Sequence, residues 1–163
     1  MAVARKTRKK RRARPELSSV YYVVQITDWD WSYGFSVNVP KWEERRYSDY
    51  RHLLIRGRVL LPTKLKLKAD TAELACLPDV RPEDIAHRGE QPPRGVGHLS
   101  ISDGKLTGSL SMASDALDPV IRLLLAGRLN FLDLYGEPLR YRQALIRSYQ
   151  IVNQLKVEDY PDD

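Results

Sequence analysis

The chain of 163 residues holds a single cysteine, Cys76, so it cannot form an internal disulfide bond. The absence of disulfides is typical of a reducing compartment and favours a cytoplasmic protein, with association to a nucleoid or a nuclear location as the other options. No apolar run approaches the roughly 20 residues of a membrane-spanning helix. The basic N-terminal stretch is not followed by the apolar segment of a secretion signal. We therefore expect neither a membrane span nor secretion.

The motifs of the common enzyme and cofactor classes are also missing. The chain has no glycine-rich phosphate loop, no dinucleotide-binding G-x-G-x-x-G, no G-x-S-x-G nucleophile turn and no H-E-x-x-H zinc motif. Its three histidines and Cys76 do not stand at the spacing of metal ligands. We expect no cofactor and no metal, and catalysis has no positive support. The weakest of our hypotheses is a hydrolase that uses the carboxylates of Asp28, Asp30 and Asp49.

Positive charge is concentrated at the N-terminus. The chain has a formal net charge of +6, but residues 1–14 carry +8, residues 156–163 carry −3, and the remainder is nearly neutral. Like charges repel, and few apolar side chains are present to form a core. We therefore expect a disordered basic arm over residues 1–19 and an acidic tail over residues 156–163. The basic residues of the arm are Arg5, Lys6, Arg8, Lys9, Lys10, Arg11, Arg12 and Arg14.

An arm of this charge density is suited to neutralising phosphate groups. Phosphate contacts position a protein on nucleic acid without reading the base sequence. The leading hypothesis is therefore a non-catalytic binding module whose arm engages nucleic acid non-specifically. An acidic protein partner, and a solvated tail that aids solubility, remain open as alternatives, and the oligomeric state is not determined.

Residues 20–155 are expected to form one β-rich domain. Residues 20–27 place bulky side chains on both faces of an expected strand, and residues 51–61 place apolar side chains at every second position of another. The fold class is therefore mainly β, either an antiparallel sandwich or an open barrel with one principal helix. An α+β two-layer arrangement is the alternative.

The pair Asp103-Gly104 lies between two alternating runs of residues. Asp-Gly in this setting predicts a two-residue type I′ turn, because both central residues of such a turn need a positive φ. A two-residue turn fixes the register of the hairpin, and it places Ile101 opposite Leu106.

A helix is expected over residues 118–127, with Asp118 as its N-cap. It is apolar nearly all round, which indicates a buried helix that packs across a sheet or closes one end of a barrel. A second hairpin is expected over residues 130–151, in which Asp133 faces Arg140 across the strands.

Large aromatic side chains alternate with carboxylates over residues 28–34, which we expect to form the tip of a hairpin. Exposed aromatic rings at a tip can stack on a partner, whereas the alternative is that the tryptophans fill the core. Residues 78–97 are rich in proline and glycine and are expected to form a long loop, either a partner-binding lid or a surface insertion. A protein-interaction or assembly component that uses the tip or the loop is our second hypothesis. The candidate partner-binding residues are Trp29, Trp31, Tyr33, Arg56 and Arg58.

Overall fold

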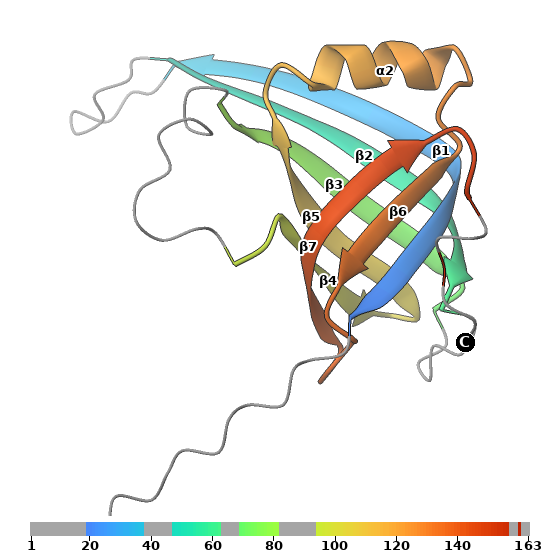
Figure 1. Cartoon of the computed structure of the whole chain (residues 1–163). Coiled ribbons are helices and arrows are strands. Elements are labelled where there is room, and N and C mark those ends of the chain that lie inside the picture. The colour runs from blue at the N-terminus through green and yellow to red at the C-terminus, as the bar shows by residue number, and fades with distance from the viewer. Residues whose placement is uncertain (1–18, 38–46, 63–68, 82–93, 157–159, 161–163) are drawn as a thin grey trace, which may run out of the picture.

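A computed structural model describes residues 19–37, 47–62, 69–81, 94–156 and 160 of the chain. Its seven strands form one sheet that closes into a barrel, in the order β1-β2-β3-β5-β4-β7-β6 (Figure 1). The expected mainly β class is confirmed. The sheet is closed, whereas we expected a sandwich or an open barrel. Closure leaves the barrel wall without a free sheet edge, which removes a common route to aggregation.

The bounds of the elements follow the alternating segments of the sequence. They are β1 (Val20–Val37), β2 (Tyr47–Leu61), β3 (Thr71–Val80), β4 (Gly97–Ser102), β5 (Lys105–Ala113), α2 (Leu117–Leu125), β6 (Phe131–Gly136) and β7 (Gln143–Val152). Among these strands, the β3–β5 pair is parallel and every other neighbouring pair is antiparallel. Of the loop expected over residues 78–97, the first three residues belong to β3 and Gly97 begins β4. Residues 82–93 lie outside the described part of the chain.

The interior of the barrel is apolar. Every strand contributes side chains at alternate positions, because successive residues of a strand point to opposite faces of the sheet. The largest fully buried side chains of the interior are Tyr22, Leu53, Ile55, Leu74, Leu99, Leu106, Leu110, Leu132, Leu134, Ile146 and Val24. Val23 is also fully buried but does not belong to this core cluster. Burial of these side chains is the main source of stability of the barrel.

The hairpin predicted at Asp103-Gly104 is confirmed in both its turn and its register. The φ angles of Asp103 and Gly104 are 50° and 74°, as a type I′ turn requires. Ile101 pairs with Leu106, and Leu106 is buried in the core.

The helix α2 lies across one end of the barrel (Figure 1). Leu117 and Leu124 are buried, whereas Leu123 and Leu125 are exposed, so one side of the helix is buried, whereas we expected burial on several sides. Its N-cap is Ala116 and no side chain caps it. The expected cap, Asp118, instead accepts a hydrogen bond from Arg122 at 2.9 Å.

In the part of the chain that the structure describes, no helix has the length and apolar character needed to cross a membrane.

The second hairpin differs from the expected one. Asp133 pairs with Gln150 rather than with Arg140. Arg140 belongs to a separate tight turn, whose central residues Tyr141 and Arg142 have φ angles of 51° and 66°. This turn takes up residues that we had assigned to the strand, and it thereby moves the pairing partner of Asp133 along β7.

Candidate binding face at the helix end of the barrel

Beyond the barrel wall, β1 and β2 continue as a two-stranded ribbon (Figure 1). Residues 32–37 of β1 and 47–52 of β2 pair with each other, since β6 reaches only Gln25 of β1 and β3 reaches only Leu53 of β2. The hairpin tip that we expected over residues 28–34 is therefore wrong, because these residues lie within one continuous strand of 18 residues. The sequence between the two ribbon strands, residues 38–46, lies outside the described residues.

One face of the ribbon continues the interior face of the barrel. Trp29 pairs with the buried Ile55, and Trp31 pairs with the buried Leu53. Trp29 is half-buried and packs against the core. From Trp31 outward the same face emerges into solvent, and we call its exposed large side chains the aromatic face. They are Trp31, Tyr33, Phe35, Val37 and Tyr47, with exposed fractions between 49% and 62%.

The side chains of the aromatic face are ordered by contacts with one another. The rings of Phe35 and Tyr47 stack, with centroids 5.6 Å apart and planes 11° from parallel. The guanidinium of Arg51 lies 5.9 Å from the centroid of the Tyr33 ring, within the range of a cation–π interaction. Arg51 also donates a hydrogen bond to Asp49 at 2.8 Å. The face therefore presents preformed aromatic platforms next to a neutral ion pair.

The opposite face of the ribbon is polar. Ser32 hydrogen-bonds to the His52 ring at 2.9 Å, and Ser36 hydrogen-bonds to Ser48 at 2.8 Å. A two-stranded ribbon with one polar and one apolar face normally packs its apolar face against a core. Here the apolar face extends past the core. Contiguous exposed apolar surface of this kind marks an interaction site.

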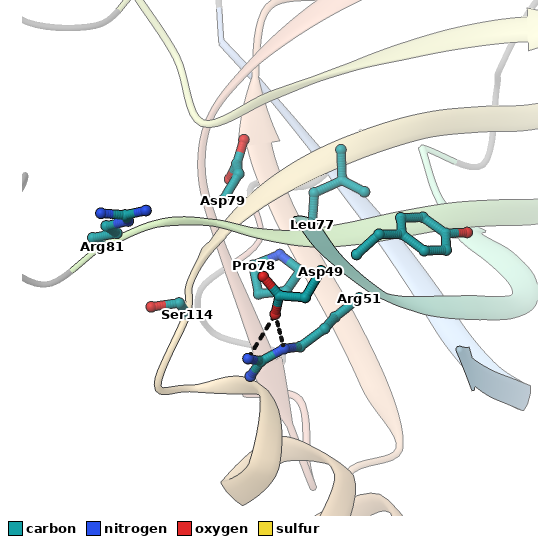
Figure 2. A pocket seen from close by; sticks show the side chains of 8 residues that line it. Asp49, Arg51, Leu77, Pro78, Asp79, Arg81 and Ser114 are labelled. Carbon is teal, nitrogen blue, oxygen red and sulfur yellow. Dashed lines mark hydrogen bonds and ion pairs between the residues drawn. The ribbon is translucent and has the colours of Figure 1, made fainter. Parts of the chain in front are cut away.

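A cleft of about 510 Å³ adjoins the ribbon at the helix end of the barrel. Figure 2 shows its lining, which comes from β2, from the end of β3 and from the turn between β5 and α2. The polar groups in it are those of Asp49, Arg51, Asp79, Arg81 and Ser114. The ion pair of Asp49 and Arg51 is drawn at its centre. The charged side chains that line the cleft are thus two carboxylates, Asp49 and Asp79, and two guanidinium groups, Arg51 and Arg81, so their formal charges cancel.

The five residues assigned to a partner surface from the sequence do not form one surface. Trp31 and Tyr33 lie on the aromatic face, but Arg56 belongs to the outer side of the barrel and pairs with Asp28 at 2.8 Å and with Glu73 at 3.4 Å. The hydrogen bond with Asp28 is the largest cause of a raised pKa for Arg56. Arg58 is exposed two residues farther along the same outer face.

The carboxylates of the hydrolase hypothesis are likewise separated. Asp28 and Asp30 are on the outer face of β1, with Asp28 paired to Arg56. Asp49 pairs across the strands with Phe35, on the opposite face, and is engaged by Arg51. The strand register thus keeps Asp49 apart from the other two. The eight basic residues of the arm lie outside the described part of the chain.

Cys76 is expected to be unreactive in the folded protein. Its side chain is fully buried, and this burial raises the pKa of the thiol to about 12. The thiolate is the reactive form, so a disulfide reagent at mildly alkaline pH should modify the native chain about a thousandfold more slowly than the unfolded chain. The absorbance of the released chromophore measures both rates. A fast reaction of one thiol per native chain would contradict this assignment.

Phe35, Val37, Tyr47 and Arg51 were not assigned to a site from the sequence. A signal for them was present, because apolar residues recur at every second position from residue 29 to residue 37. That period predicts one continuous strand with an aromatic face.

Comparison of the chain with protein-family models, curated proteins and solved structures finds no match.

Proposed function

We propose that the protein binds single-stranded nucleic acid, with bases stacked on the aromatic face and with phosphates held by the basic arm. The observation that carries the proposal is the exposure of five large side chains on one face of the ribbon. Aromatic side chains bind single strands by stacking on unpaired bases, with little dependence on base identity. A duplex hides these faces inside its own stack, so the aromatic face favours a single strand.

The spacing of the rings supports this proposal. Alternate residues of a strand lie about 6.8 Å apart, which is twice the 3.4 Å rise of one base in a stacked nucleic-acid strand. Tyr33 and Phe35 are alternate residues of β1. Every second base of a stacked nucleic-acid strand can therefore meet one ring of the aromatic face.

The division of charge also supports it. The described charges of the ribbon, Asp49 and Arg51, neutralise each other, so the aromatic face has little attraction for phosphates of its own. Residues 1–14 carry +8. Stacking and phosphate binding are thus assigned to different parts of the chain.

The arm is long enough to bind phosphates of the same nucleic-acid strand whose bases stack on the ribbon. It joins the barrel at Val20, at the end of β1 that lies opposite the ribbon (Figure 1). The path along β1 from Val20 to Trp31 measures about 36 Å at the usual rise of a strand. The arm, residues 1–19, would span up to about 60 Å if fully extended.

The test is the salt dependence of binding. In an arm-neutral variant, the eight basic residues of the arm are replaced by glutamine. Each phosphate contact with a single strand contributes about 0.7 to the slope of log affinity against log salt, so removal of eight should reduce the slope by up to about 5 to 6. Fluorescence anisotropy of a labelled oligothymidylate across a salt series measures the slope.

The matched control is Arg128→Gln, which removes one exposed charge near the helix end of the barrel. We expect it to change the slope by less than about 1. If the arm-neutral variant keeps the affinity and slope of the native chain, the arm does not hold phosphates and this part of the proposal fails.

A second candidate function is docking of a protein partner. It is favoured by Leu123 and Leu125, which α2 exposes at the same end of the barrel as the ribbon (Figure 1). Aliphatic side chains bury well against another protein but offer no platform for a base. If Leu125→Ser abolishes a measured self-association while oligonucleotide affinity is absent in every variant, this function replaces the first.

A further inference from the structure

The outer face of the barrel carries a second hollow, far along β1 from the ribbon. An open pocket of about 350 Å³ is lined by residues of β1, β6 and β7. The strand register explains the grouping, because Tyr21 pairs with Tyr135, Tyr135 pairs with Ser148, and Asp133 pairs with Gln150. Residues that pair directly share a face of the sheet. These five side chains therefore stand together on the outside of the barrel wall.

Asp133 is the unusual member of this group. It is 6% exposed and is the buried charged residue of the described chain. Its Oδ2 accepts a hydrogen bond from Nε2 of Gln150 at 2.8 Å. Its Oδ1 is buried and has no hydrogen-bond partner in the described part of the chain. Among the residues that the structure describes, no lysine or arginine lines the pocket, although buried carboxylates are almost always paired with a cation.

Aromatic rings stand beside this carboxylate. The rings of Tyr21 and Tyr135 lie with centroids 5.0 Å apart at an angle of 49°. Tyr160 approaches Tyr21 edge-on, with centroids 5.4 Å apart and planes at 87°. The faces of such rings carry partial negative charge and attract cations. The carboxylate and the rings therefore favour the same kind of ligand.

We propose that this pocket binds an organic cation that carries N–H groups, namely an alkylammonium or a guanidinium. An N–H of the cation pairs with the carboxylate of Asp133, and the alkyl or planar part lies against Tyr21 and Tyr135. The volume of the pocket falls within the range of small-molecule sites. A bare divalent cation fits less well, because such ions need about six oxygen ligands and the pocket offers one carboxylate. This inference does not depend on the proposed function.

The N–H-bearing cation in this pocket can come from two sources. One is a free small molecule. The other is an arginine or lysine side chain of the arm, since the arm joins the barrel at Val20, directly before Tyr21. The two sources predict different behaviour of the arm-neutral variant, which serves to separate them.

The probe is methylguanidinium, titrated into the full-length chain at constant ionic strength and followed by the amide NMR signals. We expect saturable shifts at residues of the pocket, and a much smaller response to tetramethylammonium, which has the charge but no N–H. Asp133→Asn should weaken methylguanidinium binding at least about tenfold, because the N–H then loses a charged acceptor. Asp30→Asn, which removes an exposed carboxylate of the outer face elsewhere on β1, should leave the affinity unchanged.

Folding of the variant is checked by its thermal midpoint. Asp133→Asn keeps the shape of the side chain and removes a buried charge without a cationic partner, so its Tm should equal or exceed that of the native chain. Tighter binding by the arm-neutral variant would identify the arm as the native occupant, and equal binding would identify a free ligand. The proposal is overturned if methylguanidinium does not saturate either chain, or if a folded Asp133→Asn variant binds it with native affinity.

Discussion

A chain that carries Tyr33→Ala together with Phe35→Ala is expected to bind single-stranded oligonucleotides at least about thirtyfold more weakly than the native chain. Stacking of a base on an aromatic side chain is worth about 1–3 kcal/mol, so the loss of two rings removes at least about 2 kcal/mol. The slope of affinity against salt should stay unchanged, because neither ring contacts a phosphate through charge. Fluorescence anisotropy at several salt concentrations measures both quantities.

The fold should survive this double substitution. Both side chains are more than half exposed, and the contacts that they lose are the stacking of Phe35 on Tyr47 and the cation–π contact of Tyr33 with Arg51. Trp31 and Trp29, which connect the aromatic face to the core, remain in place. We expect a fall in Tm of only a few degrees, which circular dichroism can follow.

Tyr50→Ala is the matched control. Tyr50 belongs to the same ribbon and is exposed to a similar extent, 56%, but the register places it opposite Gly34 on the polar face. Its removal should change the affinity by less than about twofold. Equal losses in the control and in the double variant would show that the aromatic face has no special role, and no loss in either would contradict the stacking proposal.

The parts of the fold that could be predicted are those fixed by neighbours in sequence. At Asp103-Gly104 the residue types that tolerate positive φ stand where the turn needs them, and the turn then determines the register of both strands. The helix could be located to within a residue or two because its apolar run is local in sequence, although the expected cap Asp118 does not cap it. Which side of α2 is exposed could not be predicted, because it depends on how the helix lies against the end of the barrel.

The ribbon was missed although apolar residues at every second position from residue 29 to residue 37 indicate a strand. The carboxylates of residues 28–34 favour a turn by composition. The structure keeps Asp28 within a strand, because it meets Arg56 on the neighbouring strand. The turn at Tyr141 and Arg142 was missed for a related reason. Neither residue favours positive φ, and the turn is held from outside, where Ile101 donates a hydrogen bond to the carbonyl of Arg142 at 3.0 Å.

The burial of Asp133 could likewise not be predicted from the sequence. Alternation correctly places it on the outer face of β6, where a carboxylate is normally solvated. In the structure it shares a pocket with Tyr21 and Tyr135 and accepts a hydrogen bond from Gln150 of β7. Sites of this kind depend on residues that come together only when the barrel closes.

Gly57 lies where β2 approaches β1 most closely, and Gly57→Ala is expected to destabilise the protein by about 3 kcal/mol or more. A Cβ at this position would lie 2.1 Å from the carbonyl oxygen of Gln25 and 2.6 Å from Cγ1 of Val24. The first of these is a backbone atom of the adjacent strand, so no change of rotamer relieves the overlap. The register of β1 against β2 is irregular on both sides of this point, between Val23 and Val24 and between Ile26 and Asp28. Bulges and glycines are the usual means by which a strand bends sharply around a barrel.

Gly34→Ala tests the same substitution in the same pair of strands. There the nearest atom to a new Cβ is Cδ1 of the Tyr50 ring at 3.1 Å, which belongs to an exposed side chain that can turn away. We expect a loss below about 1 kcal/mol. Urea unfolding followed by fluorescence gives both values, with the slope m as a check that each variant unfolds in two states. Similar losses for the two variants would mean that the approach of β1 to β2 at Gly57 does not exclude a side chain. A large loss at Gly57 alone would place the bend of β1, and with it the direction in which the ribbon leaves the barrel, under the control of this one glycine.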